Sequence, residues 1–78
     1  MLKELLIFPF GGNAREALLS IFAINALKKE WQVLGFIDDD KANKGKDCCG
    51  IKVLGGKEIL KRFPKANVLA VVLLIRIY

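Results

Sequence analysis

The sequence contains no histidine, and its only serine, Ser20, lies in the middle of a segment with helical periodicity. Without a histidine, these residues cannot assemble a conventional nucleophile–base pair. We therefore assign no catalytic residue, and the sequence predicts a binding domain that is incomplete as an enzyme.

Cysteine is almost as scarce, and the two cysteines, Cys48 and Cys49, are adjacent. Neighbouring cysteines rarely form a disulfide, and no other cysteine is available as a partner. Because histidine and a second cysteine pair are missing, neither a metal site nor a redox centre is indicated. We expect both cysteines to remain reduced as small apolar residues of a cytoplasmic protein.

Long apolar segments are missing as well. The longest apolar run, Val68–Ile75, has eight residues, whereas a membrane-spanning helix needs about 20. Residues Met1–Phe8 contain charges and no cleavage-type site, so no signal peptide is expected. The run at Val68–Ile75 is interpreted as a buried strand, and no membrane partner is predicted.

The composition indicates one small domain with surfaces for a partner. A chain of 78 residues is expected to form one domain. Its hydrophobic content of 54% is high, which favours contact with another domain or subunit and predicts a homo-oligomer. The net charge of +5 suits an anionic ligand. The lysines are scattered without interleaved aromatic residues, so nucleic-acid binding is not expected.

The order of apolar segments predicts a β-α-β-β-α-β chain. Strands are expected at Leu5–Phe8, Trp31–Ile37, Ile51–Leu54 and Asn67–Tyr78, and helices at Ala14–Lys29 and Lys57–Phe63. Asn13, with Glu16 three residues later, is the expected cap of the first helix. Lys41–Asp47 is polar and contains a glycine, so it is predicted to be a loop. This alternation favours an α/β fold: a single Rossmann-like domain over residues 1–78 with a parallel sheet.

The first expected helix is apolar on two sides. One stripe is predicted to cover the sheet and comprises Ala14, Ala17, Leu18, Ile21 and either Ile24 or Leu27. The other stripe comprises Leu19, Phe22, Ala23 and Ala26. A helix that is apolar on two faces is typically buried on two faces. The second stripe is therefore a candidate contact with something outside this chain.

A glycine-rich turn follows the first strand and leads into the first helix. A dinucleotide fold places G-x-G-x-x-G/A there, because backbone N–H groups and the helix dipole attract phosphate. The second glycine is present as Gly11 and the third position is Ala14, while Pro9 replaces the first glycine. Gly11, Gly12 and Asn13 are thus candidate ligand contacts, with a plain tight turn as the alternative. Arg15 either reaches the anion or is an ordinary surface residue.

The second strand ends in three acids. An acid at this position accepts hydrogen bonds from ribose hydroxyls in dinucleotide folds. Asp38 and Asp39 are the candidate ligand-binding residues, because the carboxyl end of their strand is expected beside the glycine turn. Asp40 is interpreted as part of a solvated loop. Gly55-Gly56 either leaves room for a base or sugar or, as we favour, is a plain strand-to-helix turn.

These residues together resemble one family. The resemblance rests on Leu6-Ile7-Phe8 leading to Gly11-Gly12-Asn13-Ala14-Arg15-Glu16, on Val33–Asp40 and on Gly50–Gly56. They are similar to the N-terminal domain of sugar O-acyltransferases of the sialic acid O-acetyltransferase type (NeuD/PglD-like). The resemblance covers Met1 to about Val72. It departs at Pro9-Phe10, where the family has Gly-Ala, and near Leu73–Tyr78, where the family has a glycine after the strand.

The resemblance implies binding of a nucleotide-activated sugar, typically a UDP-sugar. The phosphates would lie near Gly11, Gly12 and Asn13, and the nucleoside near Asp38 and Asp39. In the family a second domain, a β-helix that is not among these residues, binds acetyl-CoA, forms trimers and supplies a histidine base. This chain is expected to need no cofactor of its own. The alternatives are the N-terminal domain of nucleotide-sugar dehydratases and epimerases, or a non-catalytic oligomerisation module.

Overall fold

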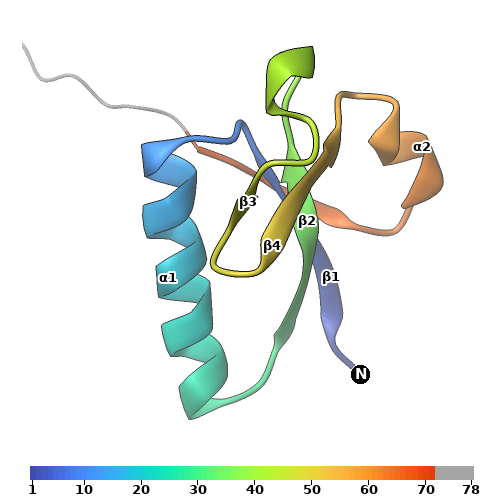
Figure 1. The fold of residues 1–78 in the computed structure, drawn as a ribbon. Helices are drawn as coiled ribbons and strands as arrows, with labels where there is room; N and C mark the ends of the chain where they lie inside the picture. Colours follow the sequence, from blue (N-terminus) through green and yellow to red (C-terminus); the bar gives the residue numbers. More distant parts are fainter. Residues whose placement is uncertain (72–78) are drawn as a thin grey trace, which may run out of the picture.

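The computed structural model describes residues 1–71, which form a mixed α/β fold (Figure 1). This part of the chain contains five strands in one sheet, two α-helices and a short 3-10 helix. The strands are β1 (Lys3–Phe8), β2 (Trp31–Ile37), β3 (Asp47–Cys48), β4 (Ile51–Gly55) and β5 (Asn67–Ala70). The helices are α1 (Gly12–Leu27), the 3-10 helix η1 (Lys41–Asn43) and α2 (Ile59–Arg62).

The strand order across the sheet is β3-β4-β2-β1-β5. Strands β4, β2, β1 and β5 run parallel to one another, as expected, whereas β3 pairs antiparallel with β4. The four predicted strands are therefore parallel, and the sheet gains an antiparallel edge strand that was not predicted. A strand of two residues is too short to show apolar alternation, and a tight hairpin leaves β3 no direction but antiparallel.

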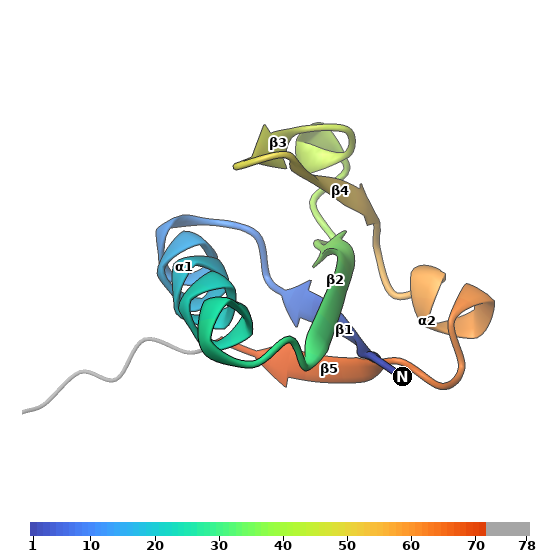
Figure 2. The same cartoon turned by 90° about the horizontal axis from the view of Figure 1, so that it is seen from below.

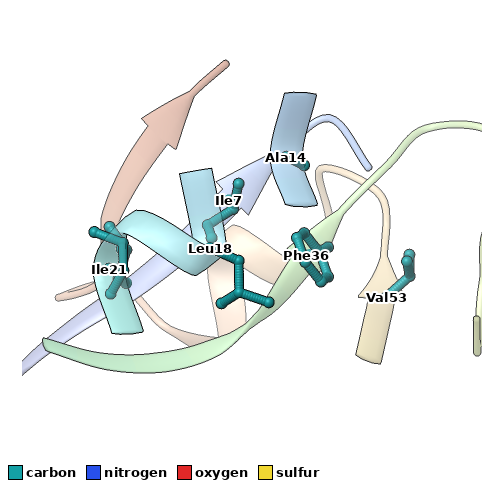
Figure 3. Packing of buried hydrophobic residues seen from close by; sticks show 7 residues of the cluster. Ile7, Ala14, Leu18, Ile21, Phe36 and Val53 are labelled. Atoms are coloured by element: carbon teal, nitrogen blue, oxygen red, sulfur yellow. The ribbon is translucent and has the colours of Figure 1, made fainter. Parts of the chain in front are cut away.

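The central strands are apolar on both faces because helices lie on both sides of the sheet (Figures 1 and 2). On the α1 side, Leu5 and Ile7 of β1 join the main core cluster. Figure 3 shows side chains from α1, β1, β2 and β4 meeting in that cluster: Ala14, Leu18, Ile21, Ile7, Phe36 and Val53. On the other side, Leu6 and Ile37 pack with Ile59 of the short helix α2.

Helix α1 buries the predicted stripe only in part. Ala14, Leu18 and Ile21 are buried, whereas Ile24 and Leu27 are exposed. The second stripe is exposed in the described chain, with Leu19 at 41% and Phe22 at 38% of their full exposure. The helix therefore covers the sheet through about two turns of one face and leaves an apolar surface on the other.

Both ends of α1 lie two residues earlier than predicted. Gly11 is the N-cap, without a side-chain hydrogen bond, and its φ of 153° is one that other residues rarely adopt. Asn13 therefore lies inside the helix, and the prediction that it caps the helix was wrong. At the other end, the Asn25 side chain accepts from the N–H groups of Glu30 and Trp31. These bonds draw the chain into β2 after Leu27.

The remaining differences concern short segments. Lys41–Asp47, predicted as a loop, contains η1 and the first residue of β3. The second helix is limited to Ile59–Arg62, before Pro64. β5 begins at Asn67 as predicted and lies at a sheet edge, while the part of the predicted strand beyond residue 71 lies outside the described residues. In the described chain, no helix has both the length and the apolar character to cross a membrane.

Candidate functional site

Three connecting segments gather at one end of the sheet, at the top in Figure 1. They are the glycine turn after β1, the acidic segment with η1 after β2, and the turn between β4 and α2. Parallel strands end at the same edge of a sheet, so their following loops meet there. Ligands of open α/β sheets bind in the crevice outside these carboxyl ends.

The glycine turn is anchored to the core through Phe10 and is open to solvent at Gly11 and Gly12. Phe10 is half-buried and packs edge-to-face on Phe36, with ring centroids 5.1 Å apart. The Gly11 carbonyl accepts the first helical hydrogen bond, from the Arg15 N–H at 3.0 Å. A Cβ atom built at Gly11 or at Gly12 would meet no described atom within 4 Å. The turn therefore presents bare backbone, which is what close approach of a phosphate needs.

Asp38 connects this turn to the other two segments. One oxygen of its carboxylate accepts from the backbone N–H of Phe10 at 3.2 Å, and the other accepts from the N–H of Asp40 at 2.8 Å. The oxygen that accepts from Phe10 also accepts from the side-chain amide of Asn43, at 3.3 Å. The backbone N–H of Asp38 donates to the Gly55 carbonyl at 2.8 Å. Asp38 therefore holds the site together, and most of its acceptor capacity is used within the chain.

Asp39 has a different environment. It is exposed, and one of its carboxylate oxygens accepts from the backbone N–H of Lys57 over a long 3.3 Å. The space next to it is kept open by Gly56, where a Cβ atom would lie 3.0 Å from the Asp39 carboxylate. Asp39 is therefore freer than Asp38 to accept hydrogen bonds from hydroxyl groups of a ligand.

A pocket of about 380 Å³ lies between the ends of β2 and β4. Its lining residues are Asp38, Asp39, Lys41, Lys44, Gly55, Gly56 and Glu58. Glu58 is oriented by the N–H of Gly56, which donates to it at 3.0 Å. Hydrogen bonds from the backbone N–H groups of Glu58 and Gly56 lower the pKa of the Glu58 carboxyl, with smaller contributions from Lys44 and Lys41. With three acids and two lysines, the pocket suits hydroxyl and amide groups better than phosphate.

No family model, curated protein or solved structure matches this chain.

The predicted site residues divide into two groups. The Phe10–Asp38 hydrogen bond holds Asp38 next to the turn that contains Gly11 and Gly12, and Asp39 lines the pocket. Asn13 is exposed on the first turn of α1. Arg15 is also exposed and lies near the β3–β4 hairpin, where its charge acts on Cys48.

The sequence interpretation missed several members of the pocket. Lys41, Lys44 and Glu58 were not singled out, and Gly55-Gly56 was taken as a plain turn. Both glycines line the pocket, as in the alternative that they leave room for a base or sugar. Asp40, interpreted as a solvated acid, caps η1 by accepting from the Ala42 N–H at 3.0 Å.

Proposed function

We propose that this chain is a Rossmann-like, cytoplasmic domain that binds a nucleotide-activated sugar, of the kind that begins sugar O-acyltransferases. The reversal of strand order beside β1 supports this assignment. The chain passes from β1 to β2 and β4 on one side, and β5 then pairs with β1 on the other. A glycine turn beside such a switch point is where the fold class binds nucleotides.

The observation on which the proposal rests is the hydrogen bond from the Phe10 N–H to the Asp38 carboxylate. It joins the turn that would receive phosphate to the strand end that would receive ribose. Both features are separated by 28 residues in the sequence, and neither alone is specific for a nucleotide. Held side by side, they match the arrangement of the diphosphate and the ribose in a nucleoside diphosphate.

The ligand is placed by charge and by available acceptors. The phosphates lie over Gly11, Gly12 and Asn13 at the start of α1, where N–H groups and the helix dipole favour anions. The ribose lies against Asp39, whose carboxylate has acceptor capacity left. The base enters the pocket lined by Lys41, Lys44 and Glu58. Asp38 positions the turn through its hydrogen bond with Phe10 and forms part of the pocket wall.

Calorimetric titration of the 78-residue chain with UDP, a UDP-sugar and uridine tests this proposal. We expect the two diphosphates to bind and uridine to bind at least about tenfold more weakly, because it lacks the phosphates that the turn attracts. Equal binding of all three would place the phosphates elsewhere. No heat and no thermal shift with any nucleotide would refute nucleotide binding.

The isolated chain is expected to show no acetyl transfer from acetyl-CoA to an amino-sugar nucleotide. The 78 residues contain no histidine to act as base, and no nucleophile–base pair is available. A coupled thiol-release assay with the purified chain measures this directly. Measurable turnover, absent from a heat-inactivated sample, would contradict the prediction.

An oligomerisation module is a second candidate, favoured by the exposed apolar stripe of α1. Leu19 and Phe22 remain accessible, and β5 lies at the edge of the sheet, where it pairs only with β1 in the described chain. Unpaired backbone groups at such an edge can pair with a second copy. Each large side chain that is buried contributes roughly 1.5–3 kcal/mol, against an association cost of at least ~4 kcal/mol.

We therefore expect self-association at micromolar concentration and a shift toward monomer on Phe22→Glu. The substitution puts a charge in the stripe at a residue that is 38% exposed and is not part of the main core cluster. Sedimentation velocity measures the change, and Ser20→Glu on the same helix is the matched control. A clean monomer of the unsubstituted chain would rule out this second candidate.

A further inference from the structure

The β3–β4 hairpin, away from the pocket, presents the two cysteines side by side. Its loop consists of Cys49 and Gly50, between the paired residues Cys48 and Ile51. Both loop residues have positive φ, 56° for Cys49 and 85° for Gly50, as the type I′ turn of two-residue hairpins requires. Asparagine, aspartate or glycine usually occupies the first of these positions. A cysteine there holds a backbone conformation that is uncommon for its type.

The two thiols are close, and they are held in different ways. Their Sγ atoms lie 3.6 Å apart. Cys48 is half-buried and packs against the main core cluster, whereas Cys49 is exposed. The prediction that both would behave as small apolar residues was therefore wrong for Cys49. Packing against the core holds the Cys48 side chain, and the hairpin turn sets the backbone of Cys49. The Cys49 thiol is open to solvent.

The spacing fits two sulfurs that share a bound centre. Two sulfurs bound to one zinc ion at about 2.3 Å in tetrahedral geometry lie about 3.8 Å apart, so sulfurs at 3.6 Å are within reach of a single bridging atom. A disulfide needs the sulfurs at about 2.05 Å, with α-carbons usually at least about 4.4 Å apart. Adjacent α-carbons are only about 3.8 Å apart. The hairpin is therefore better suited to bridging by a third atom than to a direct bond.

The two sulfurs are the ligands that the hairpin can supply to a bound atom. Among residues 1–71, no three His, Cys, Asp or Glu side chains gather closely enough to hold a metal ion. A structural zinc site takes four protein ligands, so the hairpin does not meet its needs. A trivalent arsenic that already bears one organic group needs two further bonds, and this hairpin has two thiols.

We propose that Cys48 and Cys49 form a two-thiol chelating site for a monosubstituted trivalent arsenical. Two arsenic–sulfur bonds form and the bonds from arsenic to its oxygen break. Both thiol protons leave with that oxygen as one molecule of water, and nothing is oxidised or reduced. This site is independent of the proposed nucleotide function.

The surroundings of Cys48 disfavour its thiolate, which is the more nucleophilic form. Partial desolvation and the neighbouring Cys49 thiol raise the pKa of Cys48, while the Arg15 charge acts in the opposite direction. The Cys48 thiol therefore enters the exchange with its proton, which leaves in the water.

The experiment titrates the reduced chain with phenylarsine oxide, using intact mass and thermal unfolding as readouts. We expect one adduct per chain, formed with loss of water and stable to an excess of a monothiol. The melting temperature should rise, because the folded hairpin holds the thiols ready while the unfolded chain must order them. A fall in melting temperature on binding would overturn the proposal, because the unfolded chain would then be the better ligand.

Two variants separate chelation from single-thiol reaction. Cys48→Ser and Cys49→Gly should each weaken binding by about 100-fold or more, because the second bond becomes intermolecular. Cys49→Gly is also expected to be at least as stable as the original chain, since glycine adopts positive φ freely. Loss of binding in that variant is then not a folding defect. Unchanged affinity in either variant would overturn the two-thiol site.

Discussion

Replacing Gly11 by valine is expected to abolish binding of UDP and UDP-sugars, with a loss of at least about 100-fold, or about 2.8 kcal/mol. A valine side chain would enter the open space above the turn, where the phosphates are placed. The backbone at Gly11 has a φ of 153°, which a β-branched residue resists, so the start of α1 would shift as well. Calorimetric titration beside the unsubstituted chain measures the loss.

Gly12→Ala distinguishes lost phosphate space from a distorted turn. Gly12 is the first residue of α1, its φ is not in the positive region, and a Cβ atom there meets nothing within 4 Å. Alanine should therefore leave the melting temperature unchanged or slightly raised, yet its methyl group lies on the face assigned to phosphate. We expect weaker binding in a fully folded protein. Full affinity in both glycine variants would mean that the nucleotide binds elsewhere.

Much of the fold could be predicted because its signals are local. The runs at Leu5–Phe8 and Trp31–Ile37 are apolar enough to mark central strands, and the stripe through Ala14, Leu18 and Ile21 marks a helix on a sheet. The proximity of the glycine turn to Asp38 could also be predicted from the sequence, because loops after parallel strands gather at one edge of the sheet. These predictions needed only periodicity and the direction of the strands.

The parts that were missed depend on contacts between distant residues. Asn13 has the composition of a helix cap, but the conformation of Gly11 starts the helix one residue before it. The end of α1 is decided by Asn25, whose side chain bonds to residues that follow the helix. In the pocket, Glu58 meets Lys41 and Lys44 only because β4 lies beside β2. No spacing in the sequence indicates these pairings.

Gly35 is another position whose role appears only in three dimensions. It is buried in β2, next to register shifts in the pairing of β2 with both β1 and β4. A Cβ atom at this position would lie 2.6 Å from the Leu54 Cγ atom and 2.8 Å from the Lys52 carbonyl oxygen. The side chain of Leu54 can turn aside, but the Lys52 carbonyl belongs to the neighbouring strand. Any side chain at Gly35 would therefore push β4 away from β2.

Gly35→Ala is accordingly expected to destabilise the domain by about 1–3 kcal/mol, the usual cost of overpacking. A domain of this size loses roughly 4–8 °C of melting temperature per kcal/mol, so thermal unfolding followed by circular dichroism should show the change clearly. Gly12→Ala is the matched control, because it makes the same substitution in open space and should cause no loss. Adding Leu54→Ala to Gly35→Ala should recover little stability, because the clash with the Lys52 carbonyl remains and a cavity is added. An unchanged melting temperature in Gly35→Ala would contradict the close approach of β2 and β4, on which the pocket at their carboxyl ends depends.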